Sequence, residues 1–350
     1  MNRKEFFKDL GLLSAGICLG GTDSFAFSPR SDFEKRLVPV GRVLELEGYY
    51  VWCNSPIFDH EGKVHLFFSR WNSKKGMSGW INGSEIAHAV ADKPEGPYEV
   101  KGTVLKPRQG YWDATTCHNP AIQYVDNKYC LFYMGNSNGK TNTKRIGMAI
   151  SDSLYGPWER TDEPILLPGQ EGEWDDHCTT NPAFVKYRDK YYLFYKSWNN
   201  KEYANQSGAI RANRKYGLAI ADNLLGPYEK SKANPVIDFS KYGNNAQMED
   251  AFVWLENRKF NMIARDMGYI NHENGLLMHS RNGLKWSKPE VAYRATKFYF
   301  QQEQAPKHLK KYGRFERPQL LLRDGKPVYL FTTTQGGKYK TSSPFIFKII

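Results

Sequence analysis

The chain of 350 residues lacks the features that mark several common classes of protein. It has only five cysteines, none in the C-x-x-C spacing of a structural zinc site. It has no run of five or more Lys or Arg residues, which argues against a dedicated nucleic-acid-binding arm. No stretch after the N-terminal segment is apolar enough for a membrane helix, and none has the periodicity of an ordinary amphipathic helix. The lack of helix periodicity favours a protein built from strands.

The first 26 residues predict a signal peptide rather than part of the fold. Arg3 and Lys4 begin a basic region, residues 10–21 form a short apolar region, and small residues precede position 27. The opening resembles a twin-arginine signal whose second Arg is replaced by Lys, so the export route stays open. We expect an exported protein, periplasmic or extracellular, with one domain over residues 27–350.

The cysteines do not define a disulfide framework. Cys18 could be a lipobox cysteine, although the residues before it fit that motif poorly. Cys130 lies in an apolar strand pattern and is interpreted as a core thiol. Cys53, Cys117 and Cys178 stand near the starts of three equivalent strands, where an oxidising compartment would permit a disulfide. The sequence does not determine a pairing.

One module recurs five times along the chain. It begins with an apolar strand at Asn-Pro or a similar pair, passes through a charged turn into an aromatic strand, and closes with a third strand and Gly-Pro-aromatic-Glu. Two clear copies are HNPAIQYVDNKYCLFYMGNS (residues 118–137) and TNPAFVKYRDKYYLFYKSW (residues 180–198). Equivalent points are 62 to 69 residues apart and fall at Pro56, Pro120, Pro182, Ala251 and Pro318.

This repeat predicts an all-β fold, a five-bladed β-propeller of four-stranded antiparallel sheets, because radial repetition protects sheet edges. A two-sheet sandwich would explain the strands but not the period. We expect segment 27–50 to supply the outer strand that closes the ring against the last blade. The predicted blades lie near residues 50–100, 114–160, 176–230, 246–290 and 312–350.

The x-Pro strand starts, the YYLFY-type second strands and the Gly-Pro-aromatic third strands together resemble glycoside hydrolase family 43. Its five-bladed relatives, families 32, 62 and 117, share the pattern. The resemblance covers about residues 45–350. It implies a glycosidase that cleaves arabinosides, xylosides, galactosides or related bonds, with carboxylates at the starts of the inner strands around a central channel.

The resemblance also implies positions for the catalytic groups. The family's base is an Asp just before the first-blade Pro, its modulator an Asp just before the third-blade Pro, and its acid a Glu two places before the fourth-blade Pro. In this chain the three positions hold Ser55, Asn181 and Glu249. Glu249 is therefore expected to be the general acid, since glycoside hydrolysis needs one protonated and one ionised carboxyl group. The base has to come from another residue.

Blades two and three carry candidates for that base. Asp113 and Asp175 occupy equivalent places in the repeated Trp-Asp motif, and Asp176 is additional in the third blade. Repetition equally indicates a scaffolding role for the two equivalent aspartates. His118 stands at a strand start facing the expected channel, where it could shuttle protons, bind a channel metal or be a satisfied polar residue.

Further residues near the strand starts are candidates for substrate binding. Asp250 could instead bind backbone amides, Glu316 and Arg317 could form an internal ion pair, and Trp71 could belong to the core, as could Trp52, Trp80 and Trp198. Arg70 and Arg265 follow matching aromatic strands, where each could bind a substrate carboxylate or sulfate or pair internally. The full set of expected binding residues is Asn54, Arg70, Trp71, His177, Asn181, Asp250, Arg265, Glu316 and Arg317.

The function we predict is an exo-acting glycoside hydrolase on a plant or algal polysaccharide or oligosaccharide. The net charge of +12 favours an acidic glycan, although a generally basic surface is the alternative. The alternatives to hydrolysis are a polysaccharide lyase that uses His118 or His177 with a Tyr, and a non-catalytic carbohydrate-binding propeller. No cofactor is expected to be required, a structural cation could occupy the central channel, and no nucleic-acid partner is expected.

Overall fold

The computed structural model describes residues 30–208 and 210–350, so the expected signal peptide and Cys18 lie outside the described part. This part is almost entirely β-structure and loops. The two α-helices within it are α2 (Asp32–Lys35) and α3 (Asn200–Ala204). The 3₁₀ segments are η2 (Ser73–Lys75), η3 (Met77–Ile81), η4 (Thr141–Thr143), η5 (Ser240–Tyr242) and η6 (Thr296–Phe298). None of the described helices is long and apolar enough to cross a membrane.

Three of the repeats each form a separate four-stranded antiparallel sheet. The second repeat forms β6 (Thr116–Val125), β7 (Lys128–Asn136), β8 (Arg145–Ser151) and β9 (Glu159–Arg160). The third repeat forms β10 (Thr180–Tyr187), β11 (Lys190–Ser197), β12 (Lys215–Ala221) and β13 (Glu229–Lys230). The fourth repeat forms β14 (Met248–Glu256), β15 (Lys259–Asp266), β16 (Gly275–Ser280) and β17 (Glu290–Tyr293).

The first and last repeats are connected into one eight-stranded sheet. The first repeat forms β2 (Tyr49–Phe58), β3 (Val64–Asn72), β4 (Glu85–Ala91) and β5 (Glu99–Leu105). The last forms β18 (Glu316–Arg323), β19 (Lys326–Gly336) and β20 (Thr341–Ile349), and β1 (Leu37–Arg42) pairs antiparallel with β20. The expectation that segment 27–50 supplies the outer strand of the last repeat is thus confirmed.

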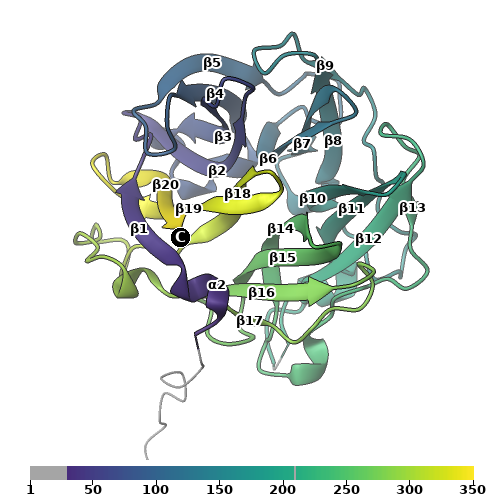
Figure 1. The fold of residues 1–350 in the computed structure, drawn as a ribbon. Coiled ribbons are helices and arrows are strands. Elements are labelled where there is room, and N and C mark those ends of the chain that lie inside the picture. Colours follow the sequence, from purple (N-terminus) through teal and green to yellow (C-terminus); the bar gives the residue numbers. More distant parts are fainter. Residues whose placement is uncertain (1–29, 209) are drawn as a thin grey trace, which may run out of the picture.

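The sheets surround a common centre, as in a β-propeller, with the first strand of each repeat innermost (Figure 1). One parallel residue pair, Tyr50 with Ser342, joins β2 to β20. Dividing the eight-stranded sheet at this pair yields five units of four strands. The propeller architecture is confirmed, whereas the count of five blades depends on that division and stays a prediction.

Apolar clusters fill the spaces between neighbouring sheets. Phe194 of β11 packs with Phe260 of β15, and Phe132 of β7 packs with Phe184 of β10. The aromatic second strands of the repeat therefore supply the core between blades. A cluster that includes Leu66 of β3 and Phe331 of β19 closes the ring between the first and last repeats.

Each innermost strand carries a β-bulge at the same place. The ladder register shifts there, and one residue adopts a positive φ between 52° and 63°. A bulge of this kind bends the strand and re-aims adjacent side chains, and Asn and Asp tolerate the left-handed conformation better than most residues. The residues with positive φ are Cys53, Asn119, Asn181, Asp250 and Arg317.

The bulges correct the sequence alignment of the first repeat. Cys53 is the structural equivalent of Asn181, because both occupy the left-handed position of the bulge. Ser55 lies beyond the bulge and pairs with Phe67. The expected base position of the first blade is therefore Cys53 rather than Ser55, since Pro56 stands two residues farther along than the prolines of the other repeats.

A histidine pair is buried across β3 and β4. His65 Nδ1 lies 2.9 Å from His88 Nε2, and His65 Nε2 lies 3.2 Å from Asp59 Oδ2. Burial, followed by the charge of His65, lowers the pKa of His88 to about 3, and burial also lowers the pKa of His65. The fold therefore stabilises the neutral imidazoles, whereas the unfolded chain binds protons on them below about pH 6.5.

The stability of the protein should consequently fall as the pH decreases from about 6.5 towards 3. Each such histidine contributes a slope of at most about 1.4 kcal/mol per pH unit, because one proton is taken up on unfolding. Replacement His88→Gln should reduce this slope in urea unfolding measured between pH 7 and 4. The exposed His60→Gln is the control, and an unchanged slope in His88→Gln would contradict the assignment.

Candidate functional site

A pocket of about 240 Å³ lies where the starts of the innermost strands converge. The residue just before each bulge lines it, so every repeat contributes one side chain. These five residues are Trp52, His118, Thr180, Glu249 and Glu316. His118 and Glu249 line this pocket, but none of Asp113, Asp175 and Asp176, of which at least one is expected to join them, does so. Of the expected binding residues, Asn181, Glu316 and Arg317 line it as well.

The bulge residues form a second, deeper layer that is connected by hydrogen bonds. Cys53 Sγ donates to Asn119 Oδ1 (2.8 Å), Asn119 Nδ2 donates to Asn181 Oδ1 (3.3 Å), and Asn181 Nδ2 donates to Asp250 Oδ1 (2.6 Å). Arg317 forms an ion pair with the same Asp250 oxygen. Burial raises the pKa of the Cys53 thiol to about 12. The thiol is thus protonated, and no carboxylate base stands at the first-blade position.

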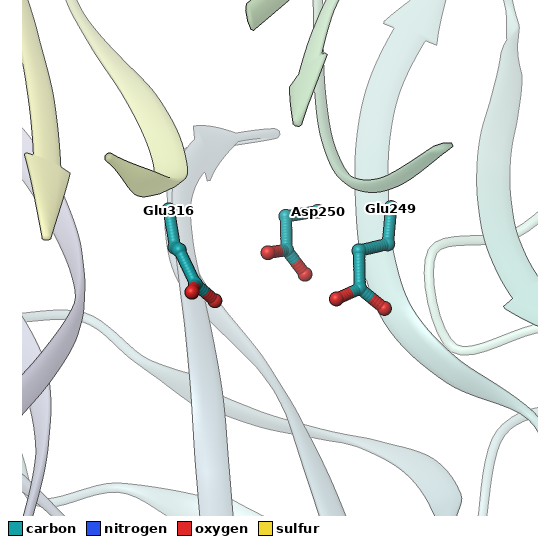
Figure 2. A group of neighbouring side chains, drawn as sticks. All are labelled: Glu249, Asp250 and Glu316. Atoms are coloured by element: carbon teal, nitrogen blue, oxygen red, sulfur yellow. The ribbon is translucent and has the colours of Figure 1, made fainter. Parts of the chain in front are cut away.

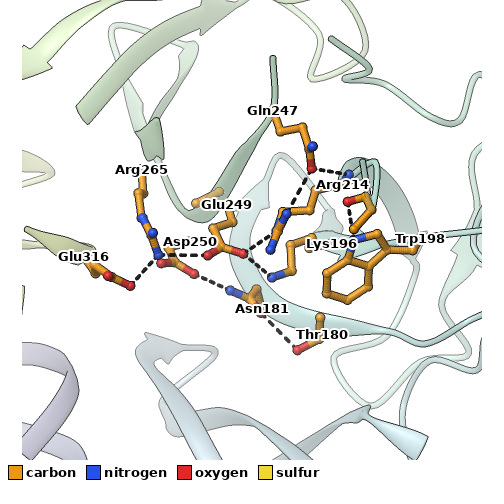
Figure 3. A network of polar contacts seen from close by, with 12 residues as sticks. Thr180, Asn181, Lys196, Trp198, Arg214, Gln247, Glu249, Asp250, Arg265 and Glu316 are labelled. Carbon is orange, nitrogen blue, oxygen red and sulfur yellow. Dashed lines mark hydrogen bonds and ion pairs between the residues drawn. The ribbon is translucent and has the colours of Figure 1, made fainter. Parts of the chain in front are cut away.

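Glu249 lies between three cationic side chains. Its carboxylate is 2.8 Å from Lys196 Nζ, 2.8 Å from Arg214 Nε and 3.0 Å from Arg265 Nη1 (Figure 3). Burial acts to raise the pKa of Glu249, but the charges of Lys196, Arg214 and Arg265 hold it well below its usual range. These contacts favour the ionised carboxylate, which is the opposite of the protonated form expected for the acid.

Two further carboxyl groups lie beside Glu249, those of Asp250 and Glu316 (Figure 2). Glu316 pairs with Arg265, and its second oxygen is 3.5 Å from Arg314 Nε. Asp250 differs from its neighbours, because burial, opposed by Arg317 and reinforced by Glu249, raises its pKa. Its Oδ2 is buried and has no hydrogen-bond partner in the described structure. The pKa of Asp250 is thus shifted in the opposite direction to that of Glu249, although Asp250 pairs with Arg317.

The same three carboxyl groups could in principle bind a cation. One ligand oxygen from each lies within 4.8 Å of the others, and hard cations prefer oxygen ligands. However, Lys196, Arg265 and Arg317 already bind these groups and would have to be displaced. The contacts therefore do not fit a bound cation, and the structural cation in the channel stays a prediction.

Cationic residues that the sequence analysis missed line the other side of the pocket. The indole ring of Trp198 lies 4.5 Å from Lys144 Nζ, 4.7 Å from Lys196 Nζ and 5.6 Å from the Arg214 guanidinium carbon. Lys144 and Arg214 are equivalent, because each stands three residues before the glycine that pairs with a tyrosine on the second strand. This repeated spacing is the signal that could have revealed them.

The three aspartates expected to supply the base are not among the residues that line the pocket. Asp113 Oδ2 accepts a hydrogen bond from Tyr133 (2.8 Å) and pairs with Arg108 and Arg160. Asp175 Oδ2 accepts the equivalent bond from Tyr195 (2.8 Å) and pairs with Lys230. These contacts anchor the loops to the blades, so the catalytic assignment of Asp113 and Asp175 is wrong and their scaffolding role is supported.

Asp176 also has a structural role. Its carboxylate accepts hydrogen bonds from the backbone amides of Gly172 (2.8 Å) and Asn200 (2.6 Å). It therefore holds two loop segments together. It does not line the pocket, and its assignment as a base stays a prediction.

The Trp-Asp motif is completed by a glycine on the third strand. A Cβ at Gly147 would lie 2.3 Å from the Trp112 ring, and one at Gly217 would lie 2.6 Å from the Trp174 ring. Only glycine leaves room for the indole against the sheet at these two positions. The repeated tryptophan and glycine thus pack each loop onto its own blade.

Four of the expected binding residues do not line the pocket and are bound to other parts of the protein. Arg70 pairs with Glu85 and stacks on Tyr49. The residue of the first repeat that is equivalent to Arg265 is Ser69, because Ser69 pairs with Trp52 as Arg265 pairs with Glu249. Arg70 is one residue farther along the strand, so its side chain lies on the opposite face of the sheet.

The other three bind within the protein. Trp71 is buried and stacks on Tyr50, and Asn54 is buried and donates to Thr333. His177 is bound between Thr141 and Asn200. In their place Trp52, Trp80 and Trp198 supply the aromatic lining of the pocket.

His118 fits the description of a satisfied polar residue. Its Nδ1 lies 2.8 Å from Ser84 Oγ, its Nε2 lies 3.6 Å from Cys53 Sγ, and its ring is enclosed by Trp71 and Trp80. Burial, followed by the charges of Arg317 and Lys144, lowers the pKa of His118 well below its usual range. Both ring nitrogens therefore have protein neighbours, which argues against a free proton shuttle.

Comparison with known proteins yields one family and a set of similar structures. The sequence matches the model of glycosyl hydrolases family 43 over residues 50–257, which confirms the resemblance drawn from the motifs. No curated protein matches.

Similar solved structures include a family 117 glycoside hydrolase from the marine bacterium Zobellia galactanivorans, with a TM-score of 0.66, 18% identity, and coverage of 89% of this chain and 90% of that chain. Another is a family 43 β-xylosidase/α-arabinofuranosidase from a compost microbial metagenome, in complex with xylotriose. For it the TM-score is 0.59, the identity 17%, and the coverage 89% of this chain and 95% of that chain. At these identities the likeness establishes the fold alone.

Removing the anchors of the loops should reduce stability. Asp113→Ala and Asp175→Ala each leave a buried tyrosine hydroxyl and a cation without their partner, so each should lower the free energy of unfolding by about 2–4 kcal/mol. Urea unfolding measures this loss. The control is Asp189→Ala, an exposed position in the third repeat, which also contains Asp175. If either anchor variant were as stable as the wild type, its scaffolding role would be contradicted.

Proposed function

The chain belongs to family 43 of the glycosyl hydrolases, and from this membership we propose that its pocket removes a terminal sugar from a plant or algal oligosaccharide or polysaccharide. The observation that carries the proposal is an anionic carboxylate, Glu249, in the wall of a pocket lined by three tryptophans. Flat aromatic faces stack on sugar rings, and carboxyl groups perform the cleavage.

The size of the pocket supports exo attack. Its volume of about 240 Å³ is below the roughly 300–1,000 Å³ of ordinary ligand pockets, which suits a single sugar ring rather than several. The bulge residues Asn119, Asn181 and Arg317 form part of its wall. A chain end can enter such a pocket, whereas the middle of a polysaccharide cannot pass through it.

We compare the two carboxyl groups by their surroundings. Glu249 is ionised, so it suits a base or the stabilisation of positive charge on the sugar ring in the transition state. Burial raises the pKa of Asp250, which is the direction that an acid needs, but Asp250 pairs with Arg317 and is not among the residues that line the pocket. Both groups lie on β14, where the bulge brings their carboxyl oxygens within 4.8 Å of each other.

The two alternative functions predict different products. A lyase would need a histidine free to remove a proton, and both nitrogens of His118 and of His177 have protein neighbours. A binding propeller would explain why Cys53 and Asn181 replace the family's carboxylates. Hydrolysis releases a reducing sugar, elimination leaves a product that absorbs in the ultraviolet, and binding alone produces neither.

Replacing Glu249 should abolish most of the activity. Glu249→Gln should lower kcat by about 10²–10⁴-fold, the usual contribution of a group that takes part in proton transfer. Release of reducing sugar from a panel of plant and algal oligosaccharides measures it, and unfolding midpoints confirm that the variant is folded. Glu256→Gln, at the far end of β14, is the control. A folded Glu249→Gln with full activity would contradict the role.

The mode of attack has its own test. Product analysis during the first few per cent of conversion should show a monosaccharide and a polymer shortened by one unit. Early release of mixed oligosaccharides would instead indicate attack within the chain.

We also propose that the enzyme is exported, on the strength of its first 26 residues. N-terminal sequencing of the protein recovered from the periplasm or medium should then find a start near residue 27. An intact N-terminus in the cytoplasmic fraction would contradict this.

A further inference from the structure

The charges in the pocket lining are unbalanced. Among the described residues that line it, two are carboxylates, Glu249 and Glu316, and four are cations. The four cations are Lys144, Lys196, Arg214 and Arg317. Buried charges are normally paired, because taking an unpaired charge out of water is costly. The pocket therefore has more positive charge than its own acids neutralise.

Lys144 is the cation without an acidic partner. Its residue is 4% exposed, and its ammonium group contacts the rings of Trp198 (4.5 Å) and Trp80 (5.8 Å). No described oxygen accepts a hydrogen bond from its Nζ, although the group lines the pocket. Two indole faces stabilise a cation only partly. The ammonium thus has hydrogen-bonding capacity that a ligand in the pocket can use.

Arg214 contributes from the equivalent place in the next repeat. Its Nε binds Glu249 (2.8 Å) and its Nη1 binds the Gln247 side chain (3.0 Å), which leaves Nη2 without an acceptor among the described residues. Arg265 and Arg317, in contrast, are bound to Glu316 and Asp250. Arg317 also lines the pocket and has an Nε without a partner in the described part of the chain, but its charge is paired with Asp250, whereas Lys144, beside Trp198, has no acidic partner there.

We propose that Lys144 and Arg214 bind an anionic substituent, a carboxylate or a sulfate ester, on the sugar that occupies the pocket. The substrate class is then an acidic glycan, an inference that rests on the proposed function only in taking a sugar as the ligand. The sugar ring stacks on the tryptophans while its acidic group pairs with the two cations. A neutral sugar would leave the Lys144 ammonium unpaired, so the site discriminates against it.

Arg70 and Arg265 are not the source of this specificity. Arg70 lies outside the pocket lining, and Arg265 is occupied by Glu249 and Glu316. Recognition depends instead on the two residues that repeat three places before the third-strand glycine. The pKa of Lys144 is shifted by the charges of Cys178, Lys196, Glu249 and Arg317. The charge of Lys144 in turn lowers the pKa of His118 and of His177.

Binding of named monosaccharides tests the proposal without any need for hydrolysis. Isothermal titration calorimetry would compare D-galacturonate, D-galactose and D-galactose 6-sulfate on the wild-type protein at low ionic strength. We expect one or both acidic sugars to bind at least about tenfold more tightly than galactose, with an advantage that shrinks in high salt. The carboxylate and sulfate arms distinguish the two sources of negative charge.

Variants show whether the preference depends on Lys144. Lys144→Met should reduce the affinity for the preferred acidic sugar about tenfold or more, whereas Lys140→Met, an exposed cation just before η4, should not change it. Burial, and then the charges of Lys196 and Arg317, lower the pKa of Lys144 to about 7. Affinity should therefore fall as the pH rises above 7 in the wild type, and should persist in Lys144→Arg.

The outcomes separate this proposal from the proposed function. Equal binding of galactose and the acidic sugars, no binding by any of the three, or full acid preference in folded Lys144→Met would each overturn the anion site. Acid-selective binding with no hydrolysis of any oligosaccharide would leave the anion site intact and contradict the glycosidase assignment. Hydrolysis of neutral glycans alone would support the glycosidase assignment and contradict the anion site.

Discussion

The bulge at the start of each innermost strand is the constraint on which the rest of the structure depends. In all five repeats one residue takes a left-handed conformation, and its neighbour is thereby aimed into the pocket. Since the bulge residues bind one another in sequence from Cys53 to Arg317, they connect the five inner strands about the centre. The bulges therefore produce two layers, the residues before them that line the pocket and the bulge residues that are connected by polar contacts.

Electrostatics then decide what each pocket residue can do. Glu249 stands among three cations and is ionised, whereas Asp250, one residue later on the same strand, is buried with one oxygen unpartnered. Neighbouring carboxyl groups thus acquire opposite tendencies from their surroundings rather than from their chemistry. The same low-dielectric surroundings make the unpaired ammonium of Lys144 significant, because a solvated lysine in that place would need no partner.

Equivalent positions of the repeats serve both the structure and the pocket. Positions that recur with the same residue type, such as Trp112-Asp113 and Trp174-Asp175 with their glycines, pack loops onto blades. The pocket is lined by positions that differ between repeats, such as the residues before the bulges, and also by recurring cationic positions such as Lys144 and Arg214. A ring of equivalent strands can bind an asymmetric sugar only if equivalent places hold different side chains.

The sequence by itself determined the strand pattern, the repeat, the family and the residue Glu249, since these depend on periodicity and on local motifs. It even indicated the closing strand at residues 27–50, later found as β1 on β20. It could not determine the first-blade alignment, because a bulge changes register without leaving a mark in composition, and so Cys53 was overlooked in favour of Ser55. Nor could it reveal that Asp113 and Asp175 are buried against tyrosines or that Glu249 is surrounded by Lys196, Arg214 and Arg265. Those facts depend on which side chains from distant repeats meet in space, and the protonation of a buried carboxyl group is decided by such neighbours, so only the tertiary structure could settle them.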